Sequence, residues 1–160
     1  MPPIIFHNGA LILEDRILRG GSLEVDGPRI TAIHPGVGPA GRRVDLEGGY
    51  VAPGFVDLHV HGGDGADFMD GTQEAFRTAC RAHLRHGTTS LVPTTTVGRH
   101  DQHLAFLELC RRLKPDPVDG ARILGAHFYG PYFAYEARGA HPGAGVRPRF
   151  PWSMSSTSPS

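Results

Sequence analysis

The pattern of apolar and polar residues predicts short β-strands in the first third of the chain. Apolar runs alternate with polar or glycine-containing turns from Ile4 to Ile33. The strands expected from these runs cover residues 4–6, 11–13, 22–25 and 29–33. Asp26-Gly27 favours a tight hairpin turn between the last two runs. Residues 34–49 are rich in Gly and Pro and predict a connection that ends in a strand near 44–46.

The pattern changes after Pro53-Gly54. Residues 55–61 alternate between apolar and polar side chains, which predicts a strand with Asp57, His59 and His61 on one face. The elements expected next are a helix at 74–86, a strand at 88–94, a helix at 101–113 and a strand at 122–128. Strands that alternate with helices over short connections predict an α/β fold with a parallel sheet. Such a sheet begins either a doubly wound fold or a (β/α)8 barrel.

Charge and composition exclude some partners. The chain has 16 basic and 16 acidic residues, so no overall field attracts nucleic acid or an anionic membrane. The first residues do not resemble a signal peptide, and no apolar stretch approaches the roughly 20 residues of a membrane helix. We therefore expect a cytoplasmic protein with no nucleic-acid or membrane partner. Cys80 and Cys110 fall in the predicted helices and are expected to be reduced, structural residues.

His59 and His61 are the first candidates for chemistry. Two residues of a strand span about 6.6 Å, since the rise is about 3.3 Å per residue, so both imidazoles can reach one divalent cation. The alternative is a pair of strand histidines that are satisfied by hydrogen bonds. The pair ends a strand and precedes Gly62-Gly63-Asp64-Gly65, which we interpret as a loop that lets the backbone approach a ligand. This context predicts a metal half-site, meaning two of the ligands of one cation.

The sequence then becomes specific enough for a family resemblance. Residues 53–62, Pro-Gly-Phe-Val-Asp-Leu-His-Val-His-Gly, resemble the first barrel strand of the amidohydrolase superfamily, in which both histidines bind metal. Three stretches together are similar to the N-acetylglucosamine-6-phosphate deacetylases, namely residues 62–70, residues 87–94, and residues 125–133 followed by 138–141. The resemblance covers about residues 4–146.

This resemblance implies a domain organisation. Residues 1–52 correspond to a small β-domain segment, which such enzymes build from both chain ends. Residues 53–146 correspond to the first three strand-helix units of a partial (β/α)8 metallo-dependent hydrolase barrel. Residues 147–160 lose all periodicity and are expected to form a disordered or aberrant tail.

Tyr129 departs from the family pattern. The third-strand motif usually reads His-Leu-Glu-Gly-Pro, and its glutamate binds metal, whereas this chain has His-Phe-Tyr-Gly-Pro. A phenol with a reference pKa of about 10 is a poorer ligand at neutral pH than a carboxylate. Tyr129 therefore stays open between a phenolate ligand and a side chain that lines the pocket. We expect His127, on the same strand, to be buried and satisfied.

The resemblance also implies an activity. It implies that Ala140 and His141 contact an amino-sugar phosphate, and that a divalent cation, zinc or iron, assists hydrolysis of N-acetylglucosamine 6-phosphate to glucosamine 6-phosphate and acetate. The general-base aspartate is expected downstream, because a barrel takes about 250 residues. We therefore expect a truncated chain that is inactive alone, and leave open whether the full-length protein is a homo-oligomer. The alternatives are cyclic amide hydrolysis or deamination on the same scaffold, and a noncatalytic fragment that binds a sugar phosphate.

Overall fold

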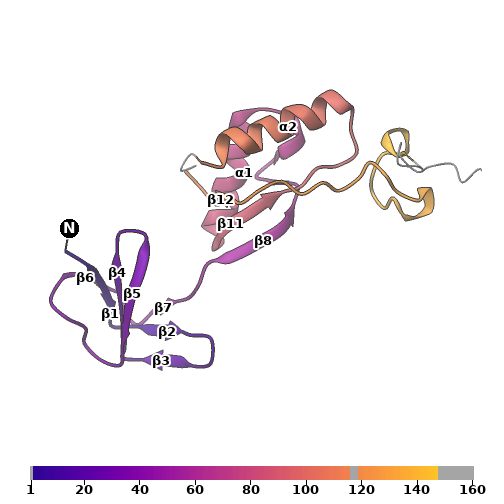
Figure 1. The fold of residues 1–160 in the computed structure, drawn as a ribbon. Helices are drawn as coiled ribbons and strands as arrows, with labels where there is room; N and C mark the ends of the chain where they lie inside the picture. Colours follow the sequence, from indigo (N-terminus) through magenta and orange to yellow (C-terminus); the bar gives the residue numbers. More distant parts are fainter. Residues whose placement is uncertain (1, 116–118, 148–160) are drawn as a thin grey trace, which may run out of the picture. The chain divides into compact units, whose positions relative to one another are not determined.

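Residues 2–115 and 119–147 are described by the computed structural model of the chain. The chain divides into two units, Met1–Pro53 and Gly54–Ser160, which are treated separately below (Figure 1). Apart from Arg147, the tail expected at 147–160 lies outside the described residues. In the part of the chain that is described, no helix is long and apolar enough to cross a membrane.

The first unit consists of two small β-sheets. The larger has the strand order β5-β4-β1-β6, with β5 (Arg29–His34), β4 (Ser22–Asp26), β1 (Ile4–His7) and β6 (Arg42–Asp45). The smaller contains β3 (Ile17–Arg19), β2 (Ala10–Ile12) and β7 (Tyr50–Val51). The five predicted strands are confirmed to within two residues. β3 and β7 were not predicted, because such short strands depend on pairing with β2 more than on their own pattern.

One turn and one longer connection of this unit are fixed by identifiable interactions. β4 and β5 pair with Asp26 opposite Arg29, and Gly27 has a φ of 54°, which confirms the predicted hairpin. The buried hydroxyl of Ser22 accepts a hydrogen bond from the Gly38 amide at 2.8 Å and donates one to the Gly36 carbonyl at 2.7 Å. This hydroxyl therefore ties the Gly-rich connection to β4.

The second unit is a parallel sheet with two helices. Its strand order is β12-β11-β8, with β12 (Arg122–Ile123), β11 (Thr88–Pro93) and β8 (Phe55–Val60). The helices are α1 (Gln73–Arg85) and α2 (His100–Leu113), and three short 3-10 turns are η1 (Phe68–Asp70), η2 (Tyr135–Ala137) and η3 (Gly143–Gly145). The strands follow one another in sequence order, so an α/β fold is confirmed. Both a doubly wound fold and a barrel contain such a run.

The helices begin and end close to the predicted residues. Thr72 caps α1, because its Oγ1 accepts a hydrogen bond from the Ala75 amide at 3.1 Å. Gly87 follows the helix with a φ of 91°, a conformation that glycine adopts without steric cost.

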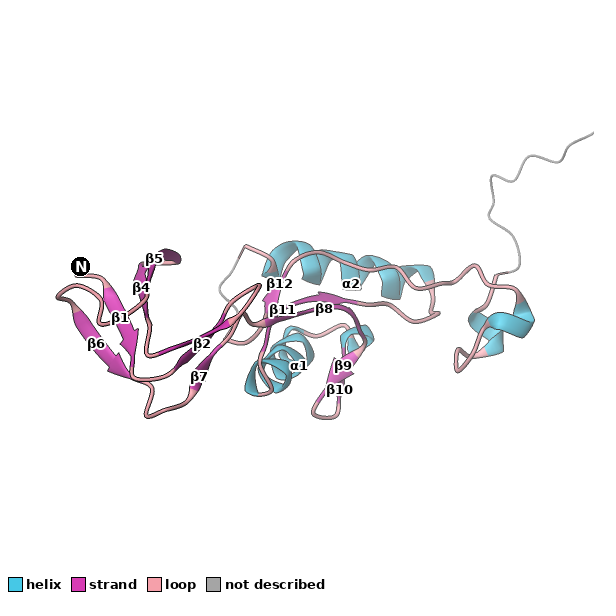
Figure 2. Cartoon of the chain, turned by 90° about the horizontal axis from the view of Figure 1, so that it is seen from below, coloured by secondary structure: helices cyan, strands magenta, loops and turns pink. Residues whose placement is uncertain are grey.

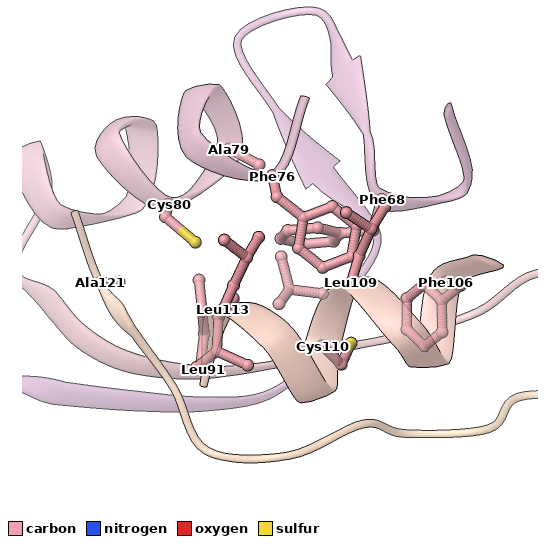
Figure 3. Close-up of a cluster of buried hydrophobic side chains, with 12 residues drawn as sticks. Phe68, Phe76, Ala79, Cys80, Leu91, Phe106, Leu109, Cys110, Leu113 and Ala121 are labelled. Atoms are coloured by element: carbon pink, nitrogen blue, oxygen red, sulfur yellow. The ribbon is translucent and has the colours of Figure 1, made fainter. Parts of the chain in front are cut away.

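Both helices pack on one face of the sheet (Figure 1), where they form a single apolar core (Figure 3). Figure 2 shows the helices and the strands of this unit in a second view. Phe76 of α1 lies at the centre, with its ring centroid 4.8 Å from that of Phe68 and 5.9 Å from that of Phe106. The other members are Val60, Ala79, Cys80, Leu91, Leu109, Cys110, Leu113, Ala121 and Ile123. Cys80 and Cys110 are free and buried, as predicted.

Strand β8 lies at the edge of this sheet, and its apolar face is only partly covered. Val60 is buried in the core, but Val56 is 56% exposed and Leu58 is 65% exposed. The alternation of apolar and polar side chains therefore predicted the faces of the strand but not how much of the apolar face is buried.

Two predictions for this unit were wrong in detail. Gly62-Gly63-Asp64-Gly65 is not an open loop but belongs to a hairpin of β9 (Gly62–Gly63) and β10 (Ala66–Asp67), with Asp64 and Gly65 at positive φ. The Asp-Gly pair was the available signal.

The predicted third strand is shorter than 122–128. After β12, Leu124 donates to the Leu91 carbonyl and His127 donates to the Pro93 carbonyl, both at 2.9 Å. The three steps from Leu124 to His127 are thus paired with the two steps from Leu91 to Pro93, and this mismatch is a β-bulge. Pro93 has no amide proton for a regular ladder, and this interrupts the strand.

Candidate metal centre

His59 and His61 lie at the carboxyl end of β8. Val60 between them points into the core, so the two imidazoles lie on the opposite face of the strand, as predicted. Asp57 shares that face, and its Oδ1 accepts a hydrogen bond from the His59 amide at 3.0 Å. This carboxylate therefore holds the backbone of His59.

The two imidazoles face each other through their Nε2 atoms, which lie 3.2 Å apart. Their ring centroids are 5.0 Å apart at an interplanar angle of 74°. Two nitrogens at about 2.0–2.1 Å from one zinc ion are separated by about 2.8–3.4 Å when the ligand angle lies between about 90° and 110°. The observed spacing fits two ligands of one cation. It also fits an N–H···N hydrogen bond donated by His59, so the geometry alone serves both interpretations.

The other nitrogen of His61 has a defined partner. Its Nδ1 lies 3.2 Å from the carbonyl oxygen of Thr94, the residue that follows β11. A carbonyl only accepts hydrogen bonds, so the neutral imidazole carries its proton on Nδ1 and keeps a lone pair on Nε2. The lone pair of His61 is therefore directed at His59.

Tyr129 lies in the middle of a cluster of rings. Its centroid is 4.7 Å from that of His59, 4.9 Å from that of His141 and 5.2 Å from that of Phe133. The backbone amide of Tyr129 donates to Oγ1 of the buried Thr95 at 3.0 Å. The tyrosine therefore sits beside the two imidazoles, at the place where the family pattern has a carboxylate.

His127 was expected to be buried and satisfied, but it is only half-buried and joins the cluster. Its ring centroid lies 4.8 Å from that of His59, and its Nδ1 is 3.4 Å from Oγ1 of Thr94. The bulge between Leu124 and His127 shifts the register of this strand, which accounts for the difference.

His141 reaches the cluster from a loop far along the chain. Its ring stacks on Phe133 with centroids 4.9 Å apart at 24°, and its Nδ1 lies 3.4 Å from the amide of Val97. Burial lowers the pKa of His141, and the neighbouring His61 and His59 lower it further. His141 therefore has a reduced tendency to become charged near neutral pH. Ala140 is exposed, and no described hydrogen bond or ring contact joins it to the cluster.

The donor set is short of carboxylates. Among residues 2–115 and 119–147, no three His, Cys, Asp or Glu side chains are arranged to hold a metal ion together. Glu136, the nearest acidic residue after the third strand, is exposed in η2. The site thus offers two imidazoles with Tyr129 beside them.

Several residues of the site were missed at the level of sequence. Thr94 and Thr95 are fully buried. The carbonyl of Thr94 contacts the His61 ring, and the hydroxyl of Thr95 accepts a hydrogen bond from the Tyr129 amide. The available signal was a run of three threonines directly after a proline at a strand end. Phe133 was missed because its loop has no periodic pattern.

Comparison with known proteins decides the family. Residues 50–149 match the Amidohydrolase family, which is more than half of the chain. The chain belongs to the amidohydrolase family. This confirms the resemblance inferred from the motif at His59 and His61.

Individual relatives of this amidohydrolase point the same way. It is 43% identical over 90 residues to the N-acetylglucosamine-6-phosphate deacetylase of Vibrio furnissii, a match that covers 56% of this chain and 23% of the relative. It is 34% identical over 146 residues to the human enzyme of that name, covering 89% of this chain and 35% of the relative.

A solved structure is similar over almost the whole chain. The N-acetylglucosamine-6-phosphate deacetylase of Pasteurella multocida matches with a TM-score of 0.84 and 29% identity, over 93% of this chain and 40% of that one. The chain therefore spans between about a quarter and two fifths of the length of these relatives.

Proposed function

We propose that this chain supplies the metal half-site of an enzyme that hydrolyses the acetamide of N-acetylglucosamine 6-phosphate to glucosamine 6-phosphate and acetate. The observation that carries the proposal is the 3.2 Å separation of the Nε2 atoms of His59 and His61, and the family match over residues 50–149 favours the metal over a hydrogen bond between the rings. The deacetylase names of the relatives support the choice of substrate.

The architecture that goes with this function is the start of a (β/α)8 barrel. In this proposal, residues 1–52 are a small β-domain segment and residues 53–146 are the first three strand-helix units. The sequential parallel order β12-β11-β8 and the covering of one sheet face by α1 and α2 support it. The imidazoles lie at the carboxyl ends of the strands, where α/β barrels carry their catalytic groups.

A divalent cation, zinc or iron, fits the two imidazoles. His59 and His61 would hold it, and a bound cation supplies activation of water and polarisation of the amide carbonyl. The residues of this chain orient the half-site, since Asp57 holds the His59 backbone and Thr94 holds the His61 ring. A general base would come from outside these 160 residues.

His141 and Ala140 are proposed to contact the sugar phosphate. Val97 directs its amide toward Nδ1 of His141, so the neutral ring carries its proton on Nε2 and can donate it to a hydroxyl or phosphate oxygen. The aromatic wall of Tyr129 and Phe133 lies next to this donor. Ala140, which is exposed, would contribute only its backbone and a small side chain.

Tyr129 is the observation that favours a second candidate. A phenol in place of the family carboxylate weakens the case for a complete deacetylase metal site and favours another amidohydrolase reaction or a noncatalytic sugar-phosphate fragment. Binding of N-acetylglucosamine 6-phosphate and of a cyclic amide such as dihydroorotate, followed by NMR shifts of Tyr129 and His141, separates a sugar-phosphate site from a cyclic-amide site. Zinc binding separates the deacetylase half-site from a noncatalytic fragment. Selective binding of the sugar phosphate supports the proposal, and selective binding of the cyclic amide contradicts it.

The metal is tested by titration with zinc and by elemental analysis. We expect about one zinc ion per chain, lost in the His59→Ala, His61→Ala double variant. His100→Ala is the matched control, because His100 is an exposed imidazole at the start of α2. If the double variant bound as much zinc as the unsubstituted chain, the proposed metal half-site would be wrong.

A further inference from the structure

Thr94 occupies a central position between two strands of the second unit. It is fully buried, and its amide donates to the Val60 carbonyl at 2.9 Å. Its Oγ1 accepts a hydrogen bond from the Val60 amide at 3.0 Å and donates one to the Val92 carbonyl at 3.2 Å. Its own carbonyl lies 3.2 Å from Nδ1 of His61. Three of these four contacts are made to Val60 and His61, at the carboxyl end of the strand that carries the two histidines.

The hydroxyl of Thr94 is required by an irregularity in the sheet. The pairing of β8 with β11 shifts register between Leu91 and Pro93, where three steps along β8 correspond to two along β11. The hydroxyl bridges the resulting gap, because it links the Val60 amide to the Val92 carbonyl. Without it, a buried amide would have no partner, and buried polar groups are rarely left in that state.

The same residue sets the proton positions of two imidazoles. The carbonyl of Thr94 requires a proton on Nδ1 of His61. The hydroxyl of Thr94 donates its proton to the Val92 carbonyl. Its oxygen therefore acts as the acceptor in the contact with Nδ1 of His127, which lies 3.4 Å away. Both rings then carry Nδ1–H and keep a free lone pair on Nε2.

We propose that Thr94 is a positioning residue of the metal half-site, which fixes the Nδ1–H tautomer of His61 and holds the end of β8 in register. This inference rests on the proposed function only in that His59 and His61 hold the cation. Partners of this kind, which orient a metal-binding imidazole through its other nitrogen, tune affinity strongly.

Zinc affinity of the chain, measured by calorimetry, is the first test. Thr94→Val removes the hydroxyl at constant shape and is expected to weaken zinc binding by about 10–100-fold, the usual effect of losing such a partner. Thr94→Ser restores the hydroxyl and is expected to stay within about threefold of the unsubstituted chain. The control is Ser22→Ala in the first unit, which removes another buried hydroxyl that links an amide to a carbonyl. Unchanged affinity in Thr94→Val, or an equal loss in Ser22→Ala, would overturn the inference.

A metal-free measurement separates this inference from the proposed function. Long-range ¹H–¹⁵N spectra of the chain without metal report which nitrogen of His61 carries the proton. We expect Nδ1–H in the unsubstituted chain and in Thr94→Ser. Thr94→Val keeps the carbonyl that accepts from His61 but loses the hydroxyl that links Val60 to Val92, so the carbonyl should shift and a mixture of tautomers should appear. An Nε2–H tautomer in the unsubstituted chain would overturn the role of Thr94. If the unsubstituted chain binds no zinc, the proposed function is wrong. The spectra of the metal-free chain then still test the inference about Thr94.

Discussion

The ring of Tyr129 lies edge-on to the imidazole of His59, with their centroids 4.7 Å apart at an interplanar angle of 67°. This contact puts a phenol where the family pattern has a metal-binding glutamate. A neutral phenol neither balances the charge of a divalent cation nor binds it well at neutral pH. The pair therefore places the departure from the family motif directly beside the predicted metal half-site.

Substitution of Tyr129 tests what the phenol does. Tyr129→Glu places a carboxylate beside His59 and His61, and we expect zinc to bind at least about tenfold more tightly. Tyr129→Phe keeps the ring contacts, and we expect zinc affinity to change by less than about threefold if the ring only lines the site. Calorimetric titration of both variants provides the measurement. A large loss in Tyr129→Phe would instead assign the phenolate as a ligand.

His141 contributes to the dependence of stability on pH near neutrality. Burial and the two nearby imidazoles lower the pKa of His141 below its ordinary 6.5, so the unfolded chain binds this proton at a higher pH than the folded chain does. The free energy of unfolding therefore rises with pH through the region below 6.5, and the destabilisation is absent above it. Urea unfolding at about pH 5.5 and pH 7.5 should show a smaller rise for His141→Gln than for the unsubstituted chain. An identical rise in both would contradict this assignment.

The two cysteines should be unreactive in the folded chain. Burial raises the pKa of the Cys80 thiol to about 11, and burial together with Cys80 raises that of Cys110 to about 12. The thiolate is the reactive form, so a disulfide reagent at about pH 8 should modify neither thiol until urea unfolds the chain. Absorbance of the released chromophore counts the thiols. Rapid modification without urea would show that the core opens readily.

The core of the second unit depends on Phe76. This side chain is fully buried between Phe68 and Phe106, so Phe76→Ala should lower the free energy of unfolding by about 3–5 kcal/mol. The control is Leu104→Ala on α2, because Leu104 is 53% exposed and should cost less than about 1 kcal/mol. Circular dichroism during urea unfolding gives both values. Equal losses would mean that the apolar cluster does not carry the stability of this unit.

Local patterns were sufficient for much of the second unit. The alternation over residues 55–61 placed His59 and His61 opposite Val60, and the helical spacing located α1 and α2 to within a residue or so. These features depend on periods of 2.0 and 3.6 residues and on capping groups such as Thr72, which are local properties of a chain. The family motif at residues 53–62 was likewise readable without coordinates.

The hairpin after His61 and the bulge before His127 were not predicted. Asp64 and Gly65 form the turn of a hairpin in which Gly62 and Gly63 pair with Asp67 and Ala66, and the bulge lies where Pro93 cannot donate to its neighbouring strand. Both depend on which strands meet.

The sequence by itself determined the two helices, the longer strands, the face of β8 that carries the two histidines and the resemblance to the family, because these follow from local periodicity and from a contiguous motif. Only the tertiary structure decided that Nε2 of His59 and His61 lie 3.2 Å apart, that the Thr94 carbonyl lies 3.2 Å from Nδ1 of His61, and that His141 lies beside Tyr129. These relations depend on side-chain rotamers and on contacts between residues far apart in the chain. Packing of the whole unit selects them, and no local pattern encodes them.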